Sequence, residues 1–460
     1  SHGRILGMLE KLSGPSKTGL EKLFGVSKAG SSIRIELLAG LATFLTMAYI
    51  TVVNPSILST VLTLEDGSKL GTGMEFNAVF TATIIAAVVG TLIMGLWANW
   101  PVALAPGMGL NAYFTYTVIF ADGYSYQQAL TAVFVAGVVF IILSVSPARK
   151  YIINSIPKSM KLGIGAGIGL FLAIIGLSNA GIIVANEATL VGLGDVASLP
   201  VLLAGLGFII MAVLSYRKIP GSIVIGILVI SIIAWIIGET ELKGVAGSVN
   251  NPSHAFQLDF SVIATAGFIG VAFAFLFVDF LDTAGTLTSI ANLTGRVGED
   301  GEVEDIDRTL LADSSATVVG ALAGTSNTTS YIESGAGIKE GGRTGLTAVT
   351  VAVLFAACLF LAPLAQSVPA FATAPALIFI ATYFLRNIKD IDWNDVSEYV
   401  PAALAAIIMP LTYSIAYGIA IGFVSYVLIK ALSGKGRSLN YASIGVAVVS
   451  VLFFVVKVNS

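Results

Sequence analysis

Three carboxylates stand inside strongly apolar stretches of the 460-residue sequence. Asp279 and Asp282 lie in the run AFAFLFVDFLDTAGTL, and Glu333 lies in TTSYIESGAGI. A charged side chain at the centre of a bilayer costs about 2.5 to 3.5 kcal/mol, so such residues usually line a water-filled cavity or a substrate path. A carboxylate there can accept hydrogen bonds from the N–H groups of a ligand, and it can carry a proton. We therefore expect the three acids to mark a binding site.

The two aspartates are three residues apart, so they share one face of a helix. The surrounding run, 262–295, would form a straight helix about 50 Å long, which exceeds the hydrocarbon core of about 30 Å. Both acids fall near its centre. For Asp279 a structural role, capping a broken helix or bonding serine and threonine hydroxyls, stays open beside the functional one. Glu36, close to Arg34, is expected to be an interfacial charge.

The composition is that of a polytopic membrane protein. Hydrophobic residues make up 56% and charged residues 11% of the chain, against roughly 25% charged residues in soluble domains. The formal net charge of -3 gives no reason to expect a nucleic-acid partner. Cys358 is the single cysteine, and both histidines, His2 and His254, lie outside the apolar runs. We therefore expect a multi-pass protein of the cell membrane, in contact with the lipid bilayer, without a metal site or cofactor.

Fourteen apolar stretches have the length of membrane helices or of shorter broken helices. They form two sets of seven, at about 34–59, 77–99, 102–120, 127–146, 161–183, 199–216 and 219–238, and at about 262–292, 309–324, 329–338, 344–363, 372–386, 399–412 and 414–432. A further run at 441–457 remains.

Lysine and arginine predict the orientation. If the fourteen stretches cross the membrane, 21 of the 24 basic residues fall on one face, Lys69 and Lys243 fall on the other, and Lys457 is not placed. By the positive-inside tendency, the first face and the amino-terminal segment 1–33 are cytoplasmic. That segment is polar, so we expect no cleavable signal peptide. We expect 441–457 to lie along the interface or to dip back, which keeps the end of the chain inside.

Two sets with an odd number of spans have opposite topology, as in the inverted repeats of secondary transporters. A VVG tripeptide precedes a glycine-interrupted segment in each set: 88–90 precedes APGMG at 105–109, and 318–320 precedes ESGAG at 333–337. These third segments resist a continuous helix, so we expect short extended pieces that turn into half-helices. The free N–H groups of the two half-helices would then be available to a polar ligand.

Four strings carry a resemblance to a known family. GLATFLTMAYITVVNP, APGMGLNAYFTY, FVDFLDTAGTL and SYIESGAGIKEGGRTGLTA resemble the azaguanine-type purine permeases, a branch of the nucleobase-ascorbate (nucleobase cation symporter) superfamily. The resemblance runs from about residue 19 to 434. It implies an all-α fold of fourteen transmembrane segments in two inverted repeats of seven. It also implies a core domain (34–146 and 262–363), a gate domain (147–261 and 364–434), and a carboxyl-terminal segment (435–460) outside the scheme.

The resemblance also implies the site residues. The family's essential acids fall on Asp282 and Glu333, and its asparagine of the third span falls on Asn111. Asp279 matches a family position whose role stays open. The expected neighbours of the site are Thr283, Ser330, Gly107 and Gly335.

The function implied is import of hypoxanthine, guanine and adenine by proton symport, with alternating access of core against gate. A purine offers ring N–H donors, which a carboxylate can accept in parallel pairs. The proton could be carried by Asp282, Glu333 or Asp279, and the sequence does not decide between them. Whether the protein forms a homodimer also stays open.

Two other transport readings stay open: a uracil or xanthine permease, and an anion transporter of the same fold. The anion reading is at odds with the charge of Glu333. An enzyme is not expected, because the sequence has neither a Ser/His dyad nor an HExxH motif.

Overall fold

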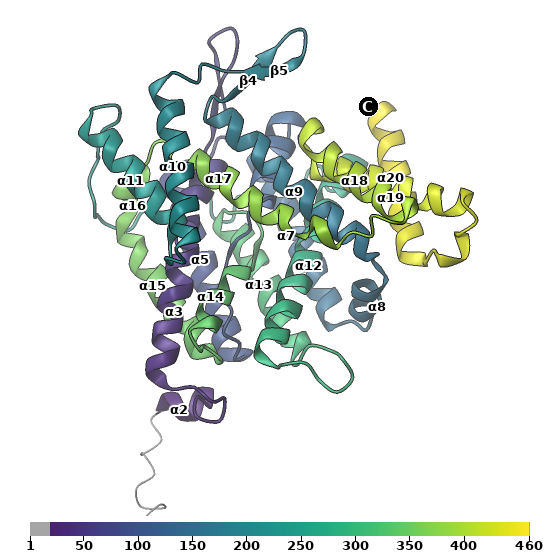
Figure 1. Ribbon diagram of the computed structural model, residues 1–460, viewed down its shortest axis with the longest axis horizontal. Helices are drawn as coiled ribbons and strands as arrows, with labels where there is room; N and C mark the ends of the chain where they lie inside the picture. The colour runs from purple at the N-terminus through teal and green to yellow at the C-terminus, as the bar shows by residue number, and fades with distance from the viewer. Residues whose placement is uncertain (1–18, 460) are drawn as a thin grey trace, which may run out of the picture.

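Apolar helices make up most of the computed structural model, which describes residues 19–459 (Figure 1). Residues 1–18 of the expected cytoplasmic segment, and Ser460, lie outside the described residues. The first half contains α2 (Gly19–Phe24), α3 (Ile33–Met47), α4 (Ile50–Leu58), β1 (Val61–Thr63), β2 (Lys69–Gly71), α5 (Phe76–Leu92), η1 (Ile93–Trp97), β3 (Leu104–Pro106), α6 (Leu110–Ala112), η2 (Tyr113–Ala121), α7 (Tyr126–Val145), α8 (Ala148–Ser155), α9 (Lys158–Asn179), β4 (Ile183–Asn186), β5 (Leu190–Leu193), α10 (Leu199–Tyr216) and α11 (Ser222–Ile236). The second half contains α12 (Ala266–Thr294), α13 (Ile306–Ala323), β6 (Thr328–Ser330), η3 (Ile332–Ser334), α14 (Gly335–Lys339), α15 (Gly345–Ala357), η4 (Cys358–Leu361), α16 (Ala362–Gln366), α17 (Ala370–Leu385), η5 (Arg386–Asp390), α18 (Val396–Thr412), α19 (Ile415–Leu432), η6 (Gly436–Ser438) and α20 (Tyr441–Asn459).

Each expected apolar stretch coincides with a helix, or a pair of broken helices, to within a few residues. Among residues 19–459, nine helices are long and apolar enough to cross a membrane. The protein is therefore a mostly helical membrane protein. The expectation of a helical fold is confirmed, and two short hairpins lie in loops, where β1 pairs with β2 and β4 pairs with β5.

A two-stranded ribbon lies in the interior, and its strands come from the two glycine-interrupted segments. β3 and β6 pair antiparallel, with Leu104 opposite Ser330 and Pro106 opposite Thr328. All residues of both strands are buried. The expected extended pieces are thereby confirmed. Because the pairing is antiparallel, the short helices that follow, α6 and η3, leave from opposite ends of the ribbon.

The two VVG motifs place their glycines against this ribbon. A Cβ on Gly90 would lie 2.6 Å from Cβ of Ala316 and 3.3 Å from Cβ of Leu104. A Cβ on Gly320 would lie 2.8 Å from Oγ1 of Thr328. In each half of the chain the glycine therefore lets one helix, α5 or α13, approach the strand that follows it.

Glu36 has a different environment from the one expected. Its side chain is fully buried and accepts hydrogen bonds from the backbone N–H groups of Arg343 (2.8 Å), Thr344 (3.3 Å) and Thr347 (3.2 Å). The hydroxyl of Thr347 donates to it as well. These N–H groups belong to the start of α15, where a helix has no backbone acceptors of its own and favours negative charge. The expectation of an interfacial charge is wrong, because the partner is distant in sequence.

The last helix, α20, has polar contacts close to both of its ends. Just before it, the amide of Asn440 donates to the carbonyl of Ser155 at 2.6 Å. In its last turn, Nζ of Lys457 lies 3.3 Å from Oδ1 of Asp122. Asp122 precedes α7 and Ser155 follows it, so α20 extends between the two opposite ends of a membrane-spanning helix. Its 19 residues give a length of about 28 Å. This placement favours a crossing of the membrane by α20 over the expected interfacial or re-entrant position, and the crossing stays a prediction.

This crossing predicts that α20 ends on the face opposite to the amino-terminal segment. An epitope tag appended after Ser460 should bind antibody on intact cells, whereas a tag before Gly19 should bind only after permeabilisation. Flow cytometry of both tagged proteins measures the difference. The same accessibility for both tags would contradict the prediction.

The buried carboxylate of Glu36 should contribute strongly to stability. Replacing it in Glu36→Ala leaves buried N–H groups unpaired, at a cost of about 1–3 kcal/mol each, so the melting temperature of the purified protein should fall clearly. Glu340→Ala removes an exposed acid nearby and serves as the control, with an expected change within about 0.5 kcal/mol. Equal melting temperatures for the two variants would disprove this role of Glu36.

Candidate functional site

Asp282 and Glu333 come together beside the ribbon. Asp282 lies on α12 and Glu333 on η3, directly after β6, and their carboxylates are close enough to interact electrostatically. Asp282 is exposed and Glu333 is partly exposed. Within residues 19–459 no hydrogen bond or ion pair engages the Asp282 carboxylate. It is therefore available to a ligand.

Glu333 is held by a residue that the sequence did not reveal. The hydroxyl of Tyr49 donates to Oε1 of Glu333 at 3.0 Å. Tyr49 is 1% exposed and lies at the break between α3 and α4. The signal in the sequence was the single tyrosine of the first span. Its contact fixes one oxygen of Glu333 and orients the carboxylate.

Asp279 has a different environment from Asp282, although only three residues separate them. It is 1% exposed, and its carboxylate accepts hydrogen bonds from the hydroxyl of Thr317 (2.9 Å) and the amide of Asn327 (3.2 Å). Thr283 is a more distant donor at 3.5 Å. These contacts join α12 to α13 and to the residue before β6. They match the structural role that the sequence left open for Asp279.

Asp313 on α13 is a further buried acid near the ribbon, and sequence reasoning missed it. Its Oδ2 accepts from the backbone N–H (2.7 Å) and the hydroxyl (2.8 Å) of Ser330. Its Oδ1 is buried and has no hydrogen-bond partner in the described part of the chain. The carboxyl groups of Asp313 and Asp279 are close enough to interact directly. The signal was an acid in LLADSSATVVG, where the neighbouring serines make the stretch look less like a membrane span.

The other expected site residues divide into two groups. Thr283 and Ser330 are buried: the Thr283 hydroxyl lies 3.0 Å from that of Thr329, and Ser330 binds Asp313. Gly335 is different, because a Cβ there would meet nothing within 4 Å. Open space therefore lies beside the backbone of Gly335, two residues after Glu333. Ser330 belongs to the ribbon, and Thr283 contacts it through Thr329.

Asn111 and Gly107 shape the turn after β3. The amide oxygen of Asn111 accepts from the N–H groups of Gly109 (3.2 Å) and Ala112 (2.8 Å), and its amide donates to Oδ1 of Asn54 at 3.2 Å. A Cβ on Gly107 would lie 2.8 Å from Cγ2 of Thr329. In the structure Asn111 is thus fully engaged by protein groups, and its role toward a ligand stays a prediction.

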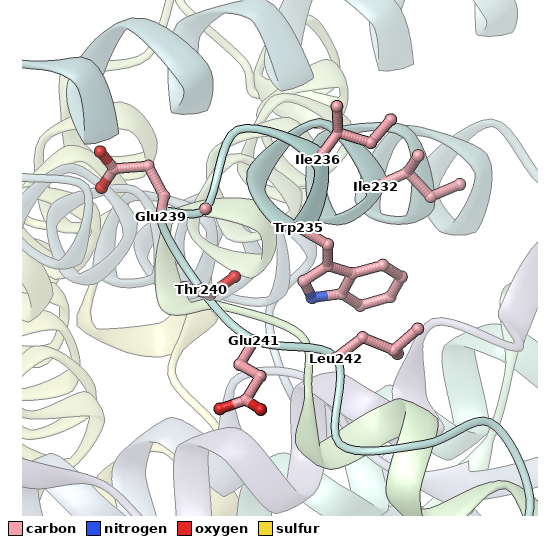
Figure 2. A pocket seen from close by; sticks show the side chains of 8 residues that line it. Ile232, Trp235, Ile236, Glu239, Thr240, Glu241 and Leu242 are labelled. Carbon is pink, nitrogen blue, oxygen red and sulfur yellow. The ribbon is translucent and has the colours of Figure 1, made fainter.

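A surface hollow of about 770 Å³ lies elsewhere, at the end of α11 (Figure 2). Trp235, Ile236 and Leu242 form its apolar side, while the carboxylates of Glu239 and Glu241 point away from it. None of the four buried or central acids lines this hollow. It is distinct from the candidate site.

The arrangement suits a small, flat, polar ligand. Asp282 and Glu333 offer carboxylate oxygens from two different elements, and open space adjoins Gly335. Two carboxylates of this kind can accept hydrogen bonds from two N–H edges of one ring. Such a site can bind and release a ligand without covalent chemistry.

Comparisons with known proteins show the family of the chain. The model of the Permease family matches residues 34–421. The guanine/hypoxanthine permease PbuO of Bacillus subtilis is 44% identical over 94% of this chain and 99% of its own length. The adenine permease AdeP of Escherichia coli is 40% identical over 95% of this chain and 96% of its own length.

The fold also has relatives among solved structures. The transmembrane domain of the cyanobacterial bicarbonate transporter BicA superposes with a TM-score of 0.62 at 17% identity, over 83% of this chain and 96% of that one. At this identity the likeness concerns the fold alone. The named relatives are permeases and not enzymes, which confirms that this protein is a transporter. The chain belongs to the Permease family, within its branch of purine nucleobase permeases.

Proposed function

We propose that this protein imports the purine nucleobases hypoxanthine, guanine and adenine by proton symport. The observation that carries the proposal is the meeting of Asp282 and Glu333 beside the ribbon, with no protein partner on Asp282 among the described residues. The names of the relatives, guanine/hypoxanthine and adenine permeases, support the substrate class.

The proposed architecture has fourteen spans in two inverted repeats of seven, with α20 as an additional helix. The antiparallel ribbon supports the repeat, because each half contributes one strand. The packing of Gly90 and Gly320 supports it too, because each lies against the strand of its own half. Core spans 34–146 and 262–363 would move against gate spans 147–261 and 364–434 to alternate access.

Within this scheme Asp282 accepts hydrogen bonds from the purine, and Glu333, oriented by Tyr49, accepts from a second edge of the ring. Gly335 leaves room for the ring. The carboxylates of Asp282, Glu333 and Asp279 are the candidates for the proton. Asp313 is a further candidate because its carboxyl group lies next to that of Asp279. Two adjacent carboxyl groups in a low dielectric are disfavoured from being ionised together, so one of the two can hold a proton.

Removing either ligand-facing charge should abolish transport. Asp282→Asn and Glu333→Gln each keep the size of the side chain but lose a charged acceptor, which is worth about 1.5–3 kcal/mol. We expect uptake of radiolabelled hypoxanthine to fall about ten- to hundredfold in a strain without purine permeases of its own. Asp307→Asn, in an exposed position, is the control. Wild-type uptake by both site variants would refute the proposed site.

Competition separates the proposed substrate from the alternatives. Unlabelled guanine and adenine should suppress hypoxanthine uptake, whereas uracil, xanthine, sulfate and bicarbonate should leave it unchanged.

A protonophore should lower uptake, and so should an increase of the external pH, because both remove the driving proton gradient. Suppression by uracil and xanthine would instead favour a uracil or xanthine permease, and insensitivity to the protonophore would count against proton coupling.

A further inference from the structure

Exposure is distributed unevenly along α12, the helix of Asp282. From Val271 to Phe280 no residue is exposed. From Asp282 onward several residues are exposed. Asp282, Gly285, Ser289 and Asn292 follow one another at intervals of three and four residues, and Thr288 and Leu293 are exposed as well. Residues with this spacing share one helix face. One half of α12 is therefore enclosed by protein, and the other half has an open polar face.

This face has the chemistry of a surface in contact with water. It carries a carboxylate, a hydroxyl and an amide, and charged or amide side chains in contact with lipid are costly. The exposed positions of α10, another membrane-spanning helix, differ clearly: Leu202, Leu206, Ile209 and Val213 are all apolar. The polar face of α12 therefore borders a water-filled space rather than lipid.

Glycines show that this space is open next to the candidate site. A Cβ on Gly285 would meet nothing within 4 Å, and the same holds for Gly335 beside Glu333. By contrast, a Cβ on Gly270, in the enclosed half of α12, would lie 2.3 Å from the Phe453 ring of α20. The free space thus begins at the two ligand-facing acids and continues along one half of the helix only.

The residues at the end of α12 indicate toward which face of the membrane its carboxyl-terminal half extends. α12 ends at Thr294, and the guanidinium of the nearby Arg296 donates to the carbonyl of Arg343 at 2.7 Å. Both arginines belong to the basic face, which the positive-inside tendency makes cytoplasmic. The polar face of α12 therefore extends from the site toward the cytoplasm.

We propose that Asp282, Gly285, Ser289 and Asn292 line the path by which the purine leaves the site for the cytoplasm, and that the structure is open on this side. The inference rests on the proposed function for its ligand, but not for the water-filled path itself. Gly285 leaves room for a flat ring, while the Ser289 hydroxyl and the Asn292 amide offer hydrogen bonds that replace those of water along the way.

Cysteine accessibility tests the path. Cys358, the single native cysteine, is first replaced by alanine, and Ser289→Cys is then labelled with a membrane-impermeant, positively charged methanethiosulfonate reagent. Because only a hydrated thiol ionises and reacts readily, we expect labelling in inside-out vesicles to be at least tenfold faster than in right-side-out vesicles. Ile142→Cys on α7 is the matched control, since Ile142 is apolar and 58% exposed and should stay unlabelled. Labelling of Ser289→Cys as slow as that of Ile142→Cys would overturn the proposal.

Added hypoxanthine distinguishes the path from its ligand. We expect it to slow the labelling of Ser289→Cys several-fold. Fast labelling from the cytoplasmic side that hypoxanthine leaves unchanged would support the water-filled path and contradict the proposed substrate.

A steric variant gives an independent measurement. Gly285→Leu fills the open space and should lower the uptake rate at least tenfold. Gly205→Leu on α10, where a Cβ would also meet nothing within 4 Å, is the matched control and should keep uptake near the wild-type level, with the same melting temperature for both purified variants. Undiminished uptake by Gly285→Leu would overturn the proposal.

Discussion

The rest of the structure depends on the pairing of two short strands inside the helical body. Within a membrane, backbone N–H and C=O groups must find partners in the protein, because lipid offers none. β3 and β6 meet this requirement for each other, although more than 200 residues separate them in sequence. The ends of this ribbon are where the backbone turns into short helices, and one of these turns carries Glu333. A binding site at a break between helices is possible only because the backbone N–H and C=O groups at the break have hydrogen-bond partners in the ribbon.

The acids around the ribbon have separate physical tasks, and burial distinguishes them. Asp279 and Asp313 are 1% and 0% exposed, and their oxygens accept from threonine, asparagine and serine groups on or near β6. Asp282 is exposed and accepts from no described residue. The first two therefore fix the position of the ribbon against α12 and α13, and the third leaves its hydrogen-bonding capacity for a ligand.

Local pattern was enough to predict the helices and the extended pieces, and it singled out Asp282 and Glu333, whose role stays a prediction. Apolar length determines a membrane helix, and Gly-x-Gly interrupts one, so these features can be read from neighbouring residues. The features that the sequence did not predict depend on residues that are far apart in the sequence. Glu36 accepts from residues 307 and 311 positions away, and Tyr49 contacts a residue 284 positions away. The position of α20 depends on Asp122 and Ser155, which no local pattern connects with its ends.

The hydrogen bond between Tyr49 and Glu333 has a consequence for the transport cycle. A carrier must return to its starting orientation without cargo, and a bare carboxylate in a low dielectric would oppose this step. A hydroxyl donor from the protein lowers that cost, since one oxygen of Glu333 keeps a partner when the site is empty. In the proposed site, a bound purine would add to this contact or replace it, and the net affinity would then be moderate. Moderate affinity is what a carrier needs, because it must release on one side what it has captured on the other.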